Sequence, residues 1–197
     1  MLTQLWRNRR KPPLGTAAWF KEWAKRLWTF PLLLQFSWRS WMLKRRGADI
    51  GPGSVLSAIQ IQGKLHWLRI GADSFIGRVE MQLEAPVEIG SRVCINDGVK
   101  IITASHDLRD PAWGRVARPI RILDYAWIAT GAVLLPGVTI GRGSVVGACA
   151  VVSKDVPDFA LAVGNPASIR GNARARELRC CPTRFLTFQT AWWEIPQ

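Results

Sequence analysis

The sequence predicts a mainly β protein, a parallel β-helix built from six-residue repeats, with an α-helical segment before it and a tail after it. Three observations carry this prediction. An aliphatic residue recurs at every sixth position in the later part of the chain, a small residue follows it at a fixed offset, and one polar stretch interrupts the pattern. The expected divisions are residues 1–47 for the helical segment, 48–168 for the β-helix with a loop at 106–119, and 169–197 for the tail.

The six-residue repeat is unbroken from residue 122 to residue 157. Its first position holds Ile122, Ile128, Leu134, Ile140, Val146 and Val152, and its fifth position holds Ala126, Ala132, Val138, Ser144, Ala150 and Val156. Helices repeat at about 3.6 residues and strands at about 2, so neither explains this period. One unit is therefore expected to be a short flat strand and a corner, and three units close a triangular coil around the aliphatic residues. Glycine at the second position, as in Gly141, is expected to relax the backbone at the turn.

The same phase occurs upstream in shorter pieces, which begin at Ile50, Ile70 and Ile89. Small irregularities are therefore expected in the coils before residue 89. The segment HDLRDPAWGRVARP at 106–119 is polar and basic and contains two prolines, so it is expected to leave the coil as a loop. Excursions of this kind often lie on the binding face of a solenoid.

The charge is concentrated at the front of the chain. Of 27 basic and 14 acidic residues, which give a net charge of +13, eleven basic residues and one acidic residue lie within residues 1–47, together with six of the 11 tryptophans. Because the charge is confined to one appendage and no groove-entering motif is present, nucleic acid is a disfavoured partner.

Other classes of protein are excluded by composition. Cys94, Cys149, Cys180 and Cys181 are irregularly spaced, which disfavours a disulfide framework, and two histidines are too few for a site of three imidazoles, so we expect no metal. The apolar stretch from Leu27 to Trp38 is shorter than the roughly 20 residues of a transmembrane helix. No compact signal peptide is evident either, and we expect a cytoplasmic protein.

Four motifs carry a resemblance to a known family: IITASHD (101–107), PIRILDYAWIATGAVLLPGVTIG (119–141), GSVVGACAVVSKDVP (143–157) and GNPASIR (164–170). They resemble the hexapeptide-repeat acyltransferases, whose fold is a left-handed parallel β-helix. The likeness is greatest to the colanic-acid-type O-acetyltransferases, and next to the maltose, galactoside and nodulation enzymes. It implies acetyl transfer from acetyl-CoA to a hydroxyl of a sugar, glycan or glycolipid intermediate in polysaccharide biosynthesis, by a homotrimer with its sites between subunits.

His106 is the expected general base. An attacking alcohol must lose its proton, and a neutral imidazole suits this task at physiological pH. By spacing alone, a surface histidine at the corner of the coil explains His106 equally well, and the resemblance assigns the catalytic role. His66 lies in an irregular stretch and is expected to be packed or exposed. In a covalent route, a histidine would have to activate the thiol of Cys94 or Cys149. No histidine lies at a fixed repeat offset from either cysteine, so direct transfer is expected.

Asn96 and Asp97 follow Ile95 at the second and third positions of a repeat. We weigh two interpretations equally: they are turn residues, or they contact the acceptor close to His106. The related sugar acetyltransferases carry an asparagine-rich stretch one coil earlier. The corresponding residues 75–80 contain no asparagine, so the acceptor stays open.

The resemblance also implies the coenzyme site, a groove between coils of adjacent subunits. The matching positions are Trp127, Thr130, Ala148, Ser153, Lys154, Asn165, Pro166 and Arg170. Small residues allow close approach of the flat pantetheine arm, and Lys154 and Arg170 are expected to meet its phosphates. Taken by itself, Lys154 would be an ordinary solvated lysine. Two other functions stay open, a non-catalytic hexapeptide scaffold and a xenobiotic acetyltransferase.

The front segment is expected to contain an amphipathic helix over residues 16–30, which Pro31 ends, and a second apolar stretch that runs to Leu43. Tryptophan with lysine and arginine is typical of helices in a membrane interface, so residues 1–46 are expected either to bind the inner membrane face or to cap the β-helix and the trimer. The tail from Asn172 to Gln197, with Phe185, Phe188, Trp192 and Trp193 among its aromatic residues, is expected to fold back on the prism or on a neighbouring subunit.

Overall fold

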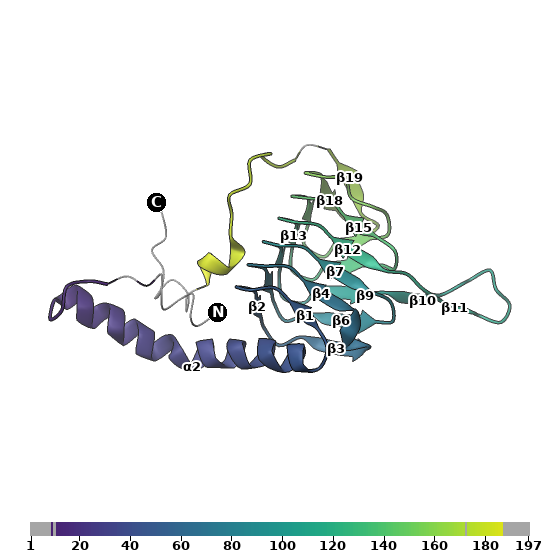
Figure 1. Ribbon diagram of the computed structural model, residues 1–197. Helices are drawn as coiled ribbons and strands as arrows, with labels where there is room; N and C mark the ends of the chain where they lie inside the picture. Colours follow the sequence, from purple (N-terminus) through teal and green to yellow (C-terminus); the bar gives the residue numbers. More distant parts are fainter. Residues whose placement is uncertain (1–8, 10, 172, 187–197) are drawn as a thin grey trace.

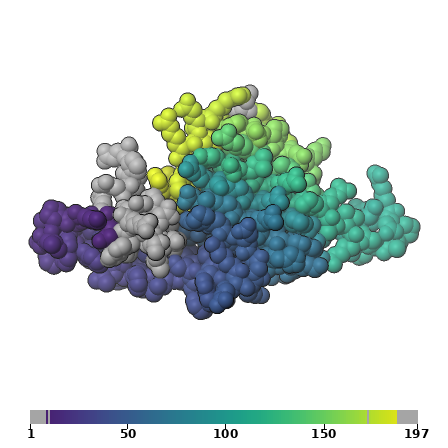
Figure 2. Space-filling view, viewed as in Figure 1, coloured from purple at the N-terminus to yellow at the C-terminus, as the bar shows by residue number. Residues whose placement is uncertain are grey.

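The computed structural model describes residue 9, residues 11–171 and residues 173–186. Short parallel strands stack into three flat walls that enclose a prism, as the repeat predicted, and the β-helix is left-handed, as the resemblance implied (Figure 1). One helix crosses the N-terminal end of the prism and extends beyond it, and a hairpin stands out from the opposite side (Figures 1 and 2).

Each wall of the prism is one sheet, and the chain passes from sheet A to sheet B to sheet C in each coil up to residue 152, after which Leu161–Val163 and Ser168–Arg170 pair antiparallel in sheet B. Sheet A contains β1 (Asp49–Ile50), β4 (Leu68–Ile70), β7 (Val87–Ile89), β12 (Ile120–Ile122) and β15 (Thr139–Ile140). Sheet B contains β2 (Val55–Leu56), β5 (Phe75–Ile76), β8 (Cys94–Ile95), β13 (Trp127–Ile128), β16 (Val145–Val146), β18 (Leu161–Val163) and β19 (Ser168–Arg170). Sheet C contains β3 (Gln60–Gly63), β6 (Glu80–Leu83), β9 (Lys100–Ile102), β14 (Val133–Leu134) and β17 (Val151–Val152).

The aliphatic first position of the repeat fills the interior. Ile122 pairs with Ile140 in the next coil and Ile128 pairs with Val146, so equivalent positions stack directly. All six aliphatic residues from Ile122 to Val152 are at most 1% exposed, and the small residues at the fifth position are at most 2% exposed. The predicted inward direction of both positions is therefore confirmed.

The predicted reason for glycine at the second position is wrong. Gly141 has no left-handed backbone, but a Cβ built on it would lie 2.5 Å from the backbone nitrogen of Asp158 in the next coil. Left-handed φ angles occur instead at other corner positions, such as Tyr125 at 61° and Gly143 at 64°. Glycine at the second position is thus required by the close approach of stacked coils and not by its conformational freedom.

The coils are irregular at the positions where the six-residue repeat is interrupted. A 3₁₀ turn, η1 (Leu65–Trp67), separates β3 from β4 and exposes His66. The polar stretch after β9 is more regular than a loop, because β10 (Ala104–His106) and β11 (Arg115–Ala117) pair in an antiparallel hairpin. This hairpin leaves the prism at Ala104, two residues earlier than expected.

The front segment forms one continuous helix, α2 (Ala17–Arg45), so the expectation that Pro31 ends a first helix is wrong. Proline removes one helical N–H and crowds the preceding turn, and the good helix formers at 32–35 continue the helix after it. The Thr16 hydroxyl caps the first turn by accepting from the backbone N–H of Trp19 at 3.2 Å. The other end of α2 packs against β1 and β2, and Leu43 contacts the core.

The described part of the tail lies back against the prism. Arg174 donates to the carbonyl of Tyr125 at 2.6 Å, and the N–H of Ala173 donates to the carbonyl of Phe159 at 3.0 Å. A second 3₁₀ turn, η2 (Pro182–Phe185), buries Thr183. The aromatic residues Phe188, Trp192 and Trp193 of the predicted tail lie outside the described residues.

Candidate active site

The β10–β11 hairpin places His106 at the corner between sheets C and A. Its tip is braced by backbone and carboxylate contacts: the N–H of Asp107 donates to the carbonyl of Gly114 at 2.9 Å, and the Asp110 carboxylate accepts from the N–H groups of Ala112 and Gly114 at 2.9 and 2.8 Å. These contacts fix the turn that carries Trp113, whose φ of 53° is left-handed.

The turn holds the imidazole of His106 in one orientation. Nδ1 of His106 lies 2.7 Å from the backbone carbonyl oxygen of Trp113, and the two rings stack with centroids 4.7 Å apart and planes 28° apart. A carbonyl oxygen only accepts hydrogen bonds, so a neutral imidazole in this contact carries its proton on Nδ1. Nε2 then has a free lone pair, which is the form that a general base requires.

A hollow of about 300 Å³ lies beside the imidazole, lined by Gln82, Ala104, Ser105, His106 and Arg115. Arg115 forms an ion pair with Glu84 of the preceding coil. Buried Thr103 links this corner to the preceding coil. Its hydroxyl donates to the carbonyl of Gln82 at 2.6 Å and accepts from the N–H of Glu84 at 2.9 Å.

Sequence reasoning missed Gln82, Glu84, Arg115 and Trp113. Gln82 pairs with Ile102 in the next coil, so counting repeats back from His106 could have identified Gln82. No spacing rule gives the pairing of His106 with Arg115 across the hairpin, because the excursion does not follow the repeat.

Asn96 and Asp97 do not lie beside His106 in the protomer. They occupy the corner between sheets B and C, and strand β9 separates them from the hairpin. The Asp97 carboxylate accepts from the backbone N–H and from Nε of Arg78, both at 2.8 Å, and these contacts lower the pKa of Asp97. Asn96 accepts a hydrogen bond from the thiol of Cys94 at 3.4 Å. In the protomer both side chains therefore lie at a turn and have partners of their own.

The eight positions matched to the coenzyme site are all exposed, but they are divided between corners. Thr130, Ala148 and the cis-linked pair Asn165–Pro166 follow one another up the corner between sheets B and C. Ser153 and Lys154 follow β17 at the corner between sheets C and A, which is the corner that carries the hairpin. Trp127 points outward from β13, and Arg170 ends β19. One protomer does not bring the eight residues into a single groove.

The cysteines do not form a nucleophilic site. Burial raises the pKa of Cys94 to about 11, so its thiol stays protonated at neutral pH. All four cysteines are free thiols. Over residues 9, 11–171 and 173–186, no group of three His, Cys, Asp or Glu side chains could hold a metal ion, and no helix is long and apolar enough to cross a membrane.

Comparisons with known proteins agree with this geometry. A family model described as bacterial transferase hexapeptide (six repeats) matches residues 119–154. Nodulation protein L of Rhizobium meliloti is 36% identical over 170 residues, covering 80% of this chain and 86% of that protein. A protein of Escherichia coli named for colanic acid biosynthesis, WcaF, is 33% identical over 136 residues, covering 68% of this chain and 74% of its own length.

Solved structures give the same result. A hexapeptide-repeat acetyltransferase of Vibrio cholerae, crystallised with acetyl coenzyme A, is 31% identical and has a TM-score of 0.64, covering 83% of this chain and 92% of that one. A maltose O-acetyltransferase of Clostridium difficile is 26% identical with a TM-score of 0.61, covering 76% of this chain and 86% of that one. With a relative above 30% identity over most of both lengths and with the repeat, coils and hairpin in place, the chain belongs to the hexapeptide-repeat acetyltransferase family.

Proposed function

We propose that this protein transfers the acetyl group of acetyl-CoA to a hydroxyl of a sugar, or of a glycan or glycolipid intermediate in polysaccharide biosynthesis, with His106 as the general base. The observation that carries the proposal is the hydrogen bond from Nδ1 of His106 to the Trp113 carbonyl, since it leaves Nε2 free to accept a proton. The names of the colanic acid biosynthesis relative and of the maltose O-acetyltransferase support a sugar-type acceptor.

In this mechanism the acceptor hydroxyl attacks the thioester carbonyl carbon while its proton passes to Nε2 of His106. The tetrahedral intermediate then breaks its carbon–sulfur bond, and the departing sulfur takes the proton from the imidazolium. The Trp113 carbonyl keeps accepting from Nδ1 throughout, so the ring does not turn between the two proton transfers. The protonated Cys94 supports direct transfer in place of an acyl-cysteine route.

The coenzyme site in this proposal lies between two copies of the chain. One copy contributes Thr130, Ala148, Asn165 and Pro166, and the other contributes His106 with Ser153 and Lys154. The outer face of sheet B supports such an assembly, because its outward residues form an apolar column: Phe75, Cys94, Trp127, Val145 and Leu161. Trp127 is 42% exposed there. A homotrimer repeats this contact around a closed ring.

His106→Ala tests the reaction. Removing a general base lowers turnover by about 10²–10⁴-fold. We expect loss of CoA release with sugar acceptors and an unchanged affinity for acetyl-CoA, with the melting temperature and oligomeric state as controls. A wild-type protein that binds no acetyl-CoA would support the scaffold alternative, and acetylation of aromatic drug hydroxyls but no sugar would support the xenobiotic one.

The shared site has its own test. His106→Ala and Ala148→Trp, a variant that fills the groove at the other corner, are each expected to be inactive. Assemblies re-formed from a mixture of the two chains are expected to regain part of the activity, because some sites then combine two intact halves. No recovery in mixed assemblies would place the whole site within one chain.

We also propose that α2 lies on an anionic membrane surface. Phe20, Leu27, Leu34 and Trp38 fall on one side of the helix and are 61%, 70%, 46% and 61% exposed. Lys21, Lys25 and Arg39 flank this stripe, a pattern typical of interfacial helices. The double variant Leu27→Glu/Leu34→Glu is expected to lose sedimentation with phosphatidylglycerol vesicles. Sedimentation equal to that of the wild type would leave α2 with its capping role alone.

A further inference from the structure

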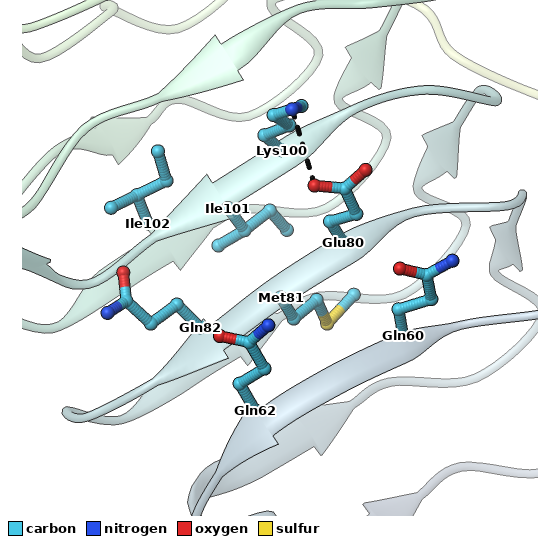
Figure 3. A pocket seen from close by; sticks show the side chains of 8 residues that line it. All are labelled: Gln60, Gln62, Glu80, Met81, Gln82, Lys100, Ile101 and Ile102. Carbon is cyan, nitrogen blue, oxygen red and sulfur yellow. Dashed lines mark ion pairs between the residues drawn. The ribbon is translucent and has the colours of Figure 1, made fainter.

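The outer face of sheet C carries a polar hollow that the proposed reaction does not use. It has a volume of about 270 Å³ and lies over strands β3, β6 and β9 (Figure 3). Its lining residues are Gln60, Gln62, Glu80, Met81, Gln82, Lys100, Ile101 and Ile102.

Two rows of outward side chains cross the hollow. Gln60 pairs with Glu80 and Glu80 with Lys100 in one row. In the other row, Gln62 pairs with Gln82, and Gln82 pairs with Ile102. The rows span two strand spacings, about 10 Å, which is longer than one sugar ring.

The side chains of the hollow are suited to binding the hydroxyl groups of a neutral ligand. Nζ of Lys100 lies 3.3 Å from Oε2 of Glu80, so the two charges offset one another. The side-chain amides of Gln60, Gln62 and Gln82 make no hydrogen bond to any residue that the structure describes, and each offers both donors and an acceptor. Half-buried Ile102 adds an apolar surface on which the carbon face of a sugar can rest.

The polar outward residues of sheet C are confined to the coils nearest the N-terminal end of the prism. Above Lys100 in the same row the outward residues are Val133 and Val151, which are aliphatic. The glutamine-bearing stretch therefore ends at the level of the coil from which the hairpin leaves.

Gln82 joins the hollow to the catalytic corner. It lines both this hollow and the one beside His106. The hydrogen bond from the Thr103 hydroxyl to the Gln82 carbonyl fixes the end of β6, so the two hollows keep their relative position.

We propose that the outer face of β3, β6 and β9 is a subsite for the part of a neutral oligosaccharide that adjoins the acetylated sugar. Gln60 and Gln62 bind hydroxyls of the distal sugars, and Gln82 binds at the junction with the reacting sugar. The inference rests on the proposed sugar O-acetylation and adds that the acceptor is an oligosaccharide and not a single sugar.

The test compares acceptors of two lengths in the full-length protein. Transfer from acetyl-CoA to glucose and galactose, and to maltotetraose and galactotetraose, is followed by thiol release in the wild type and in Gln60→Ala/Gln62→Ala. The wild type is expected to have a lower KM for a tetrasaccharide than for its monosaccharide. The double variant is expected to raise the tetrasaccharide KM about tenfold, the loss typical of two hydrogen bonds. Its kcat and its KM for the monosaccharide are expected to stay unchanged.

Gln35→Ala, which removes an exposed glutamine on α2, is the matched control and is expected to change neither KM. If the wild type acetylates sugars but the double variant keeps the wild-type KM for the tetrasaccharides, the subsite is wrong and the proposed reaction stands. If the double variant raises the KM for the monosaccharide and for the tetrasaccharide equally, or if its assembly dissociates, this face has another role and the inference also fails. If the wild type acetylates no sugar of either length, the proposed function fails and the subsite with it.

Discussion

In the proposed mechanism, Asp110 positions the imidazole of His106 from the tip of the hairpin. Its carboxylate accepts from the N–H groups of Ala112 and Gly114, and these contacts hold the turn whose Trp113 carbonyl meets Nδ1 of His106. Asp110→Ala removes both contacts. A hydrogen bond contributes about 0.5–1.5 kcal/mol net, so the ordered turn loses about 2 kcal/mol. Since about 1.4 kcal/mol is a factor of ten, the ratio of ordered to disordered turn falls roughly 30-fold, which is the upper limit for the loss of correctly oriented imidazole.

The assay is steady-state turnover with saturating acetyl-CoA. We expect Asp110→Ala to lower kcat by about 10–30-fold with little change in KM for acetyl-CoA, because the hairpin tip lies outside the prism. Asp110→Asn keeps one acceptor oxygen and should recover part of the loss. A fall in kcat at an unchanged KM for acetyl-CoA and an unchanged melting temperature separates positioning from a general structural defect.

Asp107 supplies the matched control. Within the described part of the chain, its carboxylate accepts only from the N–H of Arg109, at 2.9 Å, and does not brace the Trp113 turn. Asp107→Ala is expected to change kcat less than twofold. Equal losses in the two variants, or a wild-type kcat in Asp110→Ala, would refute the positioning argument.

Three further predictions follow from other parts of the molecule. Cys94→Ala is expected to retain turnover, because the thiol with its pKa of about 11 is protonated in the wild type; loss of activity with intact folding would restore a cysteine mechanism. Gly141→Ala should lower the free energy of unfolding by about 1–3 kcal/mol through overpacking, while Gly171→Ala, which has no atom within 4 Å of its Cβ, should be neutral in the same denaturant titration. Asp97→Asn should lower the melting temperature near pH 7. Because the folded pKa of Asp97 is lowered, this difference should shrink as the pH falls below the unfolded value of 3.8, and a difference independent of pH would contradict the assignment.

The repeat made most of the prism predictable. Interior positions from Ile122 to Val156 followed from period alone, because a stacked coil places the same repeat position on the same wall in every turn. The prediction that Pro31 ends a helix was wrong, since the good helix formers at 32–35 and the packing of the C-terminal end of α2 against β1 and β2 outweigh the cost of the proline.

The site was less predictable than the fold. His106 was predicted from its motif, but the contacts of Trp113, Asp110 and Arg115 depend on the pairing inside the hairpin, and that pairing carries no periodic signal. Asn96 and Asp97 lie one corner before His106 in the protomer, because ten residues, less than a full coil, separate Asn96 from His106.

The base of the hairpin has a consequence for how such enzymes diverge. The N–H of Arg118 donates to the carbonyl of Thr103 at 2.8 Å, and Ile120 then resumes pairing with Val87 as if nothing lay between. The coil is thus closed beneath the excursion, and the pairing of the stacked strands does not depend on the length of the hairpin. A lineage can lengthen or shorten the segment beyond its base while the stacked coils stay unchanged, so that the residues around His106 can evolve separately from the thermodynamic stability of the prism.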